Sequence, residues 1–177
     1  MYAADSRMEF GLRRDAAMAN NALWIHNENS GERKSIVWAH NVHIAKDWFT
    51  MSVEEGTIRG MGYLMKNELG DNMISIGASF NRGEYPEWGR SFPVADANTF
   101  DGMLAKAGSE YYLLSFAEVQ KLENENPYFS VEQVLRAQDF DMNCIPANCF
   151  DAFYFTDQIT HTIPNEQSAE RFRNMGE

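Results

Sequence analysis

Positive charge is scarce in this 177-residue sequence. Fifteen Lys and Arg residues stand against 26 Asp and Glu residues, so the formal net charge at pH 7 is −11. A protein that holds nucleic-acid phosphates needs clustered basic side chains, and no basic stripe is visible here. An acidic excess of this kind is typical of a solvated surface. We therefore expect no nucleic-acid partner.

Long apolar runs and cysteines are also scarce. No stretch approaches the roughly 20 apolar residues of a membrane span, so we expect no membrane partner. The opening MYAADSRMEF has neither a basic start nor an apolar stretch. This favours a cytoplasmic location, unless a signal peptide lies upstream of Met1. The two cysteines, Cys144 and Cys149, are too few for a structural zinc site, which leaves ordinary thiols, or a small disulfide in an exported protein.

Periodicity predicts an α/β layered fold with a central, mainly parallel sheet flanked by helices. Apolar residues at helical spacing predict helices from Ser6 towards Gly31 and over residues 59–70. Apolar runs predict strands over residues 35–39, 72–80, 110–116 and 150–159, and runs that are apolar on both faces are typical of parallel sheets. Residues 45–58 and 81–101 are predicted loops. The length predicts a single domain over residues 1–177, with a frayed polar tail over 164–177.

Two of the four histidines, His40 and His43, follow the predicted strand 35–39. Ligands bind at the carboxyl ends of strands in open parallel sheets, and a histidine there can act as a general base near neutral pH. A simple hydrogen bond from either histidine to a loop backbone is the alternative. Asp15 is also unusual, because it is a carboxylate on an otherwise apolar helix face and needs a partner if it is buried.

Other chemistries fit the sequence less well. A zinc site would need a third ligand besides the two histidines, such as Asp15 or Asp47, and no spacing selects one, so we expect no metal. No Gly-x-Ser-x-Gly motif is present, and neither cysteine lies in a strand-to-helix turn. Water is therefore the more natural nucleophile if the protein is a hydrolase.

Four segments, in this order and spacing, resemble the erythromycin esterase-like family: RRDAAMANNALWI, VWAHNVHIA, RGMGYLMKNELGDNMISIGASF and FDAFYFTD. The resemblance covers most of residues 12–80 and returns at 150–159. It implies an α/β fold with a deep cleft. It also implies hydrolysis of a macrolide ester by histidine-activated water, without a cofactor.

The resemblance also assigns residues. His40 and His43 match two cleft histidines of the family and are the expected catalytic residues. Arg14, Asp15 and Asn41 match positions that bind substrate or support the site, although a local ion pair or a helix-to-sheet anchor is an alternative role for Arg14 and Asp15. The expected ligand is a small-molecule ester.

One family motif is missing from the sequence. The Gly-Glu-x-x-His-Gly segment, whose histidine is the expected general base of the family, occurs nowhere in this chain. The chain is therefore interpreted as the C-terminal half of an erythromycin esterase-like domain, in which His40 and His43 bind, orient or polarise the substrate. The expected protein partners are the missing N-terminal half or a second copy of the chain.

Two further hypotheses stay open at this stage. The same fold could form a non-catalytic ligand-binding or haem-binding protein, because cleft histidines can ligate iron. The chain could also be an inactive remnant, since a fold does not fix a function.

Overall fold

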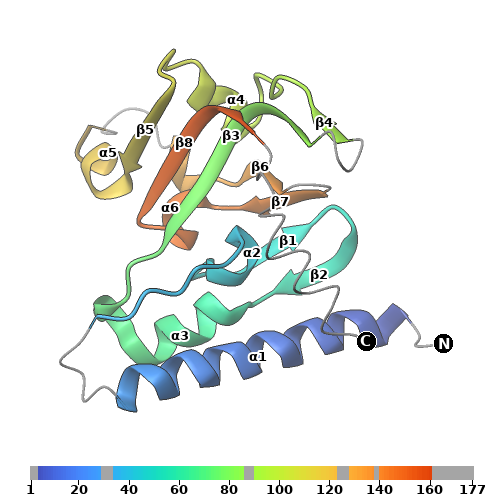
Figure 1. Ribbon diagram of the computed structural model, residues 1–177, viewed down its shortest axis with the longest axis vertical. Helices are drawn as coiled ribbons and strands as arrows, with labels where there is room; N and C mark the ends of the chain where they lie inside the picture. The colour runs from blue at the N-terminus through green and yellow to red at the C-terminus, as the bar shows by residue number, and fades with distance from the viewer. Residues whose placement is uncertain (1–3, 29–33, 86–89, 123–127, 138–139, 161–177) are drawn as a thin grey trace, which may run out of the picture.

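The computed structural model describes residues 4–28, 34–85, 90–122, 128–137 and 140–160 (Figure 1). The helices in these ranges are α1 (Ala4–Glu28), α2 (Asn41–Ile44), α3 (Met61–Leu69), α4 (Phe100–Ala105), α5 (Phe116–Leu122) and α6 (Pro146–Cys149). The strands are β1 (Phe49–Met51), β2 (Glu54–Ile58), β3 (Ile76–Tyr85), β4 (Arg90–Phe92), β5 (Tyr111–Ser115), β6 (Gln133–Ala137), β7 (Phe140–Cys144) and β8 (Ala152–Ile159).

The strands form two sheets whose pairings are mostly antiparallel. The first sheet has the order β2-β1-β7-β6 and is antiparallel throughout. The second has the order β4-β3-β8-β5, and β3–β8 is its parallel pair. The mixed α/β class is confirmed, but the prediction of a central, mainly parallel sheet is wrong. Apolar residues on both faces indicate burial of a strand and carry no information on the direction of its neighbours.

The predicted strand over residues 35–39 is also wrong. Residues 34–40 lie outside any helix or strand and lead into α2, and residues 34–38 are exposed. Ile36 is 92% exposed and Trp38 is 96% exposed. The tendency of such residues to form strands depends on packing against neighbouring strands, which the described residues do not provide at this place.

Other elements agree with the sequence or were missed by it. Helix α3 and strands β5 and β8 fall within the predicted segments. Helix α1 begins two residues before its predicted start, and β3 overlaps the predicted strand 72–80 but continues to Tyr85, into the predicted loop 81–101. Gly70 ends α3 with a φ of 55°, a conformation that favours glycine. The hairpin β1–β2 lies in the predicted loop 45–58, and β4 lies in the predicted loop 81–101. The predicted tail 164–177 lies outside the described residues.

The main core is rich in phenylalanine and contains buried residues of both sheets. The ring of Phe153 packs edge-on against Phe100 and Phe150, with centroid separations of 4.9 and 4.7 Å. A Cβ atom on Gly77 would lie 2.5 Å from the ring of Phe153, so this strand position needs a glycine. Packing at this density fixes β3 against β8.

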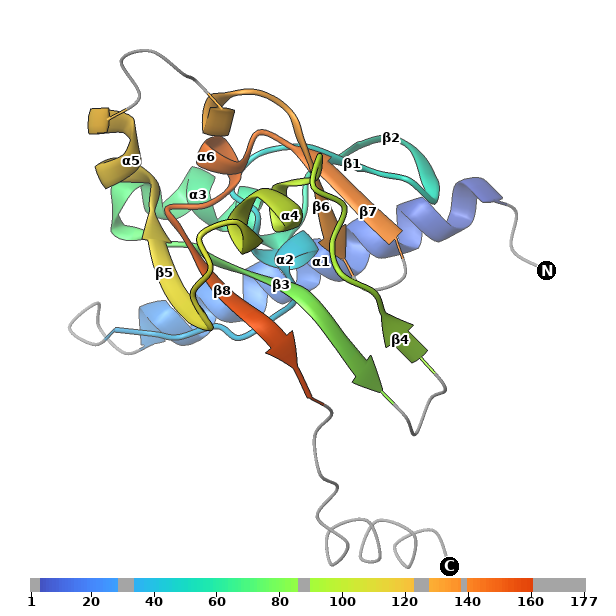
Figure 2. The ribbon, with the colours of Figure 1, turned by 90° about the horizontal axis from the view of Figure 1, so that it is seen from above.

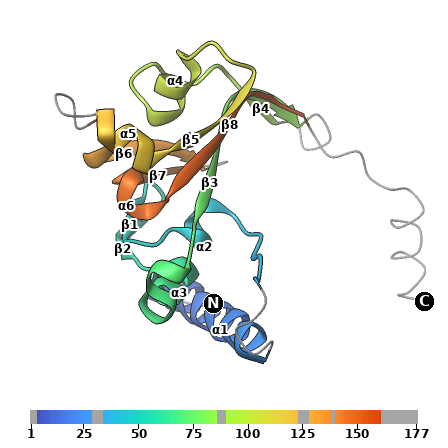
Figure 3. The same ribbon diagram turned by 90° about the vertical axis from the view of Figure 1, so that its left-hand side faces the viewer.

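A smaller cluster joins α1 to α3. Ala19 of α1 and Met61 and Met65 of α3 are its buried members. The backbone of α3 also approaches α2 closely, since a Cβ atom on Gly62 would lie 2.4 Å from the carbonyl of Ile44. Figure 3 shows α1 and α3 side by side below the rest of the protein.

A buried carboxylate connects the two sheets. Asp101 of α4 accepts hydrogen bonds from the hydroxyl of Ser79 on β3 (2.5 Å) and from the backbone N–H of Arg136 on β6 (2.7 Å). Burial raises the pKa of Asp101, and these two hydrogen bonds act in the opposite direction.

None of the helices in the described ranges has both the length and the apolar character that a membrane crossing requires.

We predict opposite effects on stability for two glycine-to-alanine substitutions in helices. Gly62→Ala should lower the free energy of unfolding by about 1–3 kcal/mol, because the new methyl group meets the backbone of Ile44. Gly11→Ala is the matched control: it has open space and should raise stability by roughly 0.5–1 kcal/mol through helix propensity. Urea unfolding measures both. Equal effects of the two substitutions would contradict the close approach of α3 to α2.

Candidate active site

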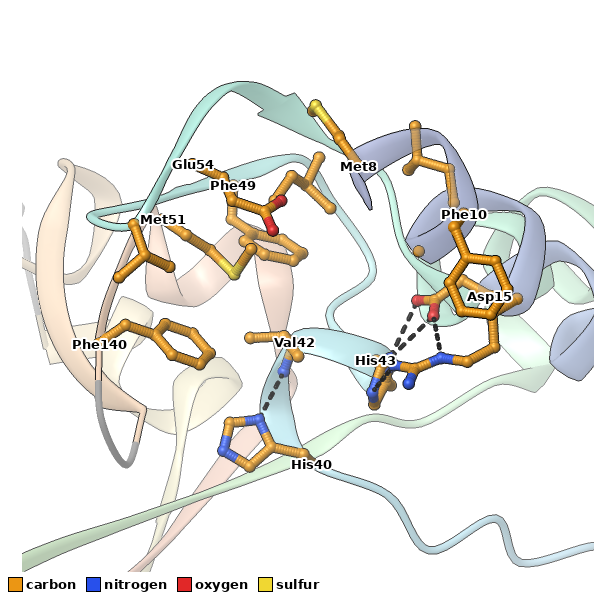
Figure 4. A pocket seen from close by; sticks show the side chains of 15 residues that line it. Met8, Phe10, Asp15, His40, Val42, His43, Phe49, Met51, Glu54 and Phe140 are labelled. Atoms are coloured by element: carbon orange, nitrogen blue, oxygen red, sulfur yellow. Dashed lines mark hydrogen bonds and ion pairs between the residues drawn. The ribbon is translucent and has the colours of Figure 1, made fainter. Parts of the chain in front are cut away.

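A cleft of about 520 Å³ separates the N-terminal half of α1 from the β1–β2 hairpin (Figure 4). Four predicted site residues line it, namely Arg14, Asp15, His40 and His43. Arg14 and Asp15 come from α1, whereas His40 and His43 lie at the start and the end of the short helix α2. The fold thus brings together side chains about 30 residues apart, and one turn of helix places the two histidines on the same cleft.

Asp15 is the buried polar group of the cleft, at 6% exposure. Its carboxylate accepts a hydrogen bond from the backbone N–H of Met61 at 3.0 Å, and His43 Nδ1 lies 3.0 Å from it. Gly60 permits this approach, because a Cβ atom there would lie 2.8 Å from Asp15 Oδ2. The partners of this buried carboxylate are therefore His43 and the first N–H of α3. Arg14 Nε lies 4.0 Å from Asp15 Oδ1, so the local ion pair considered as an alternative for these two residues is also present.

The contacts of His43 determine its tautomer. Arg14 Nη2 lies 3.0 Å from His43 Nε2, and a guanidinium can only donate hydrogen bonds. Nε2 must therefore carry the lone pair, and Nδ1 carries the proton that is donated to Asp15. An imidazole held by a carboxylate on one nitrogen is the arrangement of a histidine that can accept a proton on the other.

His40 has a different environment. It is the N-cap residue of α2, and its Nδ1 accepts a long hydrogen bond of 3.4 Å from the backbone N–H of Val42. The remaining nitrogen, Nε2, then carries the proton and can act as a donor. Burial, and then repulsion from His43, lowers the pKa of His40 below its ordinary value of 6.5. The backbone hydrogen bond considered as an alternative for the histidines is thus present at His40.

Asn41 does not line the cleft. Its buried side chain donates a hydrogen bond to the carbonyl of Ala78 (2.7 Å) and accepts one from the N–H of the same residue (2.9 Å). The amide thereby occupies the edge of β3 as a neighbouring strand would. Asn41 therefore supports the site by holding α2, which carries both histidines, against β3.

Sequence reasoning missed the apolar wall of the cleft. This wall comes from the start of α1 and from β1, β2 and β7, and it includes Met8, Phe10, Met51, Val53 and Phe140. The ring of Phe140 lies 6.3 Å from that of His40. No local pattern marks these residues, because they face the cleft only through the position of α1 opposite a hairpin that the sequence did not predict.

Metal-binding groups are not found in the described ranges. No group of three or more His, Cys, Asp or Glu residues there could hold a metal ion. Cys144 and Cys149 are free and fully buried in the main core. Their mutual hydrogen bond, and then burial, raises the pKa of Cys144 strongly, so this thiol stays protonated and poorly nucleophilic.

Two solved structures share this fold. A Bacillus cereus protein superimposes with a TM-score of 0.69 at 19% identity, over 90% of this chain and 41% of its own. A protein described as a succinoglycan biosynthesis protein gives a TM-score of 0.63 at 22% identity, over 82% of this chain and 38% of its own. At these identities the likeness concerns the fold alone.

Sequence comparison gives the family. The Escherichia coli protein described as erythromycin esterase type II is 36% identical over 80 residues, which are 42% of this chain and 18% of that protein. The chain thus spans well under half of the length of each of these relatives. The family model for erythromycin esterase matches residues 1–159, so this chain belongs to the erythromycin esterase family.

Proposed function

We propose that this chain carries the histidine and carboxylate groups of a carboxylic-ester hydrolase, and that it opens a lactone or another ester with activated water. The observation that carries the proposal is the hydrogen-bonded series Asp15–His43–Arg14 on the cleft. Family membership supports an ester as the substrate class. The apolar wall and the volume of the cleft favour a large, mostly apolar ester such as a macrolide lactone.

In the proposed reaction His43 acts as the base. The neutral Nε2 takes a proton from water as the water oxygen bonds to the ester carbonyl carbon, and Asp15 stabilises the imidazolium that forms. The carbonyl oxygen becomes an oxyanion. When the tetrahedral intermediate collapses, the C–O bond to the alcohol breaks and the proton on His43 passes to the leaving alkoxide. The products are an acid and an alcohol, which stay in one molecule if the ester was a lactone.

Arg14 and His40 are proposed to stabilise the oxyanion. The guanidinium of Arg14 is half-exposed and would move from His43 Nε2 to the oxyanion, which frees the base at the same time. His40 would contribute its Nε2–H as a neutral donor, because its lowered pKa keeps it uncharged near pH 7. Each side chain then has a role that its hydrogen bonds in the free protein allow.

Removal of the base should abolish most of the activity. We predict that His43→Ala lowers kcat/KM for macrolide lactone opening or p-nitrophenyl acetate hydrolysis by about 10²–10⁴-fold. His26→Ala is the matched control, since His26 lies on α1 outside the cleft and contacts the hydroxyl of Ser35. Mass spectrometry of the opened ring and absorbance of the released phenolate measure the rates. No hydrolysis by the wild-type chain, or equal rates for both histidine variants, would contradict the proposal.

Asp15→Asn tests whether the carboxylate fixes the tautomer. An amide can donate to His43 Nδ1, which would move the imidazole proton to Nε2, where it faces Arg14. We expect kcat to fall by roughly 10²–10⁴-fold, with a smaller change in KM, because a catalytic histidine in the wrong tautomer cannot accept the proton. Nitrogen NMR shifts of His43 should report the change of tautomer. An unchanged tautomer together with full activity would limit Asp15 to a structural role.

The lowered pKa of His40 predicts an acid-side loss of stability. Folded His40 takes up its proton only below the ordinary value of 6.5, whereas the unfolded chain takes it up near that value. Between the two pKa values the unfolded state holds more protons, so the free energy of unfolding falls as the pH decreases below about 6.5. Urea unfolding across this range should give a shallower pH dependence for His40→Gln than for wild type. Parallel curves would show that His40 titrates alike in both states.

A further inference from the structure

Among the described residues, no helix covers one face of the second sheet. On β3, β8 and β5 the buried residues alternate with an exposed apolar row, which consists of Ile76, Ala78, Tyr111, Leu113 and Tyr154 and is called here the open sheet face. Leu113 and Tyr154 are direct cross-strand neighbours and are 61% and 47% exposed. Figure 2 shows β5, β8 and β3 side by side, and Figure 3 shows α4, α5 and α6 gathered on one side of them.

The edge of β3 beside this face is only partly paired. Among the described residues β4 pairs with β3 only from Gly83 to Tyr85, so the same edge of β3 has no neighbouring strand further towards its start. Asn41 binds that edge at Ala78, and segment 34–40, of which residues 34–38 are exposed, leads into it. Ile36 and Trp38 of this segment, with Ile74 just ahead of β3, add three exposed apolar side chains. Such an edge and face together are a template for further strands and helices.

We propose that the open sheet face and segment 34–40 dock the part of the erythromycin esterase domain that this chain does not span. Strands β8 and β5 present Tyr154 and Leu113 to solvent side by side on this face, and a contiguous exposed apolar patch of this kind marks an interaction surface. The match to each solved relative leaves more than half of that relative's chain without a counterpart here. A remainder of that size can supply both a helical layer for the face and a strand for the edge.

Two other occupants fit less well. A second copy would bring together two chains with a net charge of −11 each, and their repulsion opposes association. The chain's own residues 161–177 contain only three large apolar side chains, Ile163, Phe172 and Met175, which are too few to form a covering layer. The inference rests on family membership and on the exposed surface, and it is independent of the proposed hydrolysis.

Co-expression tests the proposal. The probe is the part of the Escherichia coli erythromycin esterase type II protein that has no counterpart in this chain, produced as a separate polypeptide together with the full 177-residue chain. Size-exclusion chromatography with light scattering gives the stoichiometry, and hydrogen exchange gives the protection of segment 34–40. Leu113→Lys and Tyr154→Lys alter the face, and Val131→Lys, at an exposed position just ahead of β6 in the other sheet, is the matched control.

We expect a 1:1 complex, slower exchange of segment 34–40 in it, and a Kd that is roughly tenfold or more weaker for each face variant but unchanged for Val131→Lys. Circular dichroism confirms that the variants are folded. A homodimer that the face variants disrupt would overturn the proposal in favour of a second copy. A chain that stays monomeric in the presence of the probe would also overturn it. So would a complex whose Kd is unchanged by both face variants. Binding is measured without substrate, so its outcome is separate from that of the hydrolysis assays.

Discussion

The arrangement of the site depends on one buried carboxylate. Asp15 joins three helices, because α1 carries it, α2 presents His43 to it and α3 donates its first backbone N–H to it. A charge at this depth is stable only while both donors stay in place, since an uncompensated buried charge is very costly. The same contacts leave the Nε2 lone pair of His43 directed at Arg14. The stability of the helical layer and the charge state of the site therefore have a common origin.

The two histidines illustrate how a short helix separates chemical roles. His40 caps α2 and its pKa is lowered by burial, whereas the ring of His43, one turn later, is oriented by its contacts with Arg14 and Asp15. The hydrogen-bonded amide of Asn41 fixes this helix to the edge of β3. A lone helix of four residues would be unstable in water, so its geometry comes from these contacts and not from helix propensity.

Part of this was predictable from the sequence. Helical spacing located α1 and α3, and the isolated Asp15 on an apolar face predicted a buried partner that could not be named until the fold placed His43 beside it. Strand direction was not predictable, because an apolar run such as that of β3 reads the same whichever way its neighbours run. The run at Ile36 and Trp38 has the composition of a buried strand but has no neighbouring strand in the described part of the chain, so local composition was misleading. The apolar cleft wall depends on packing between distant segments and left no local signal.

The position of the cleft has a further consequence for rigidity. One wall belongs to α1, which packs with α3 in the smaller cluster, and the other belongs to β1 and β7, which are part of the main core. A ligand that touches both walls adds a further connection between the two clusters. By thermodynamic linkage, the free energy that the ligand gains from correctly placed walls equals the free energy with which it holds them there. A change that destabilises the position of α1 therefore weakens ligand binding, and a tightly bound ligand stabilises the position of the helix.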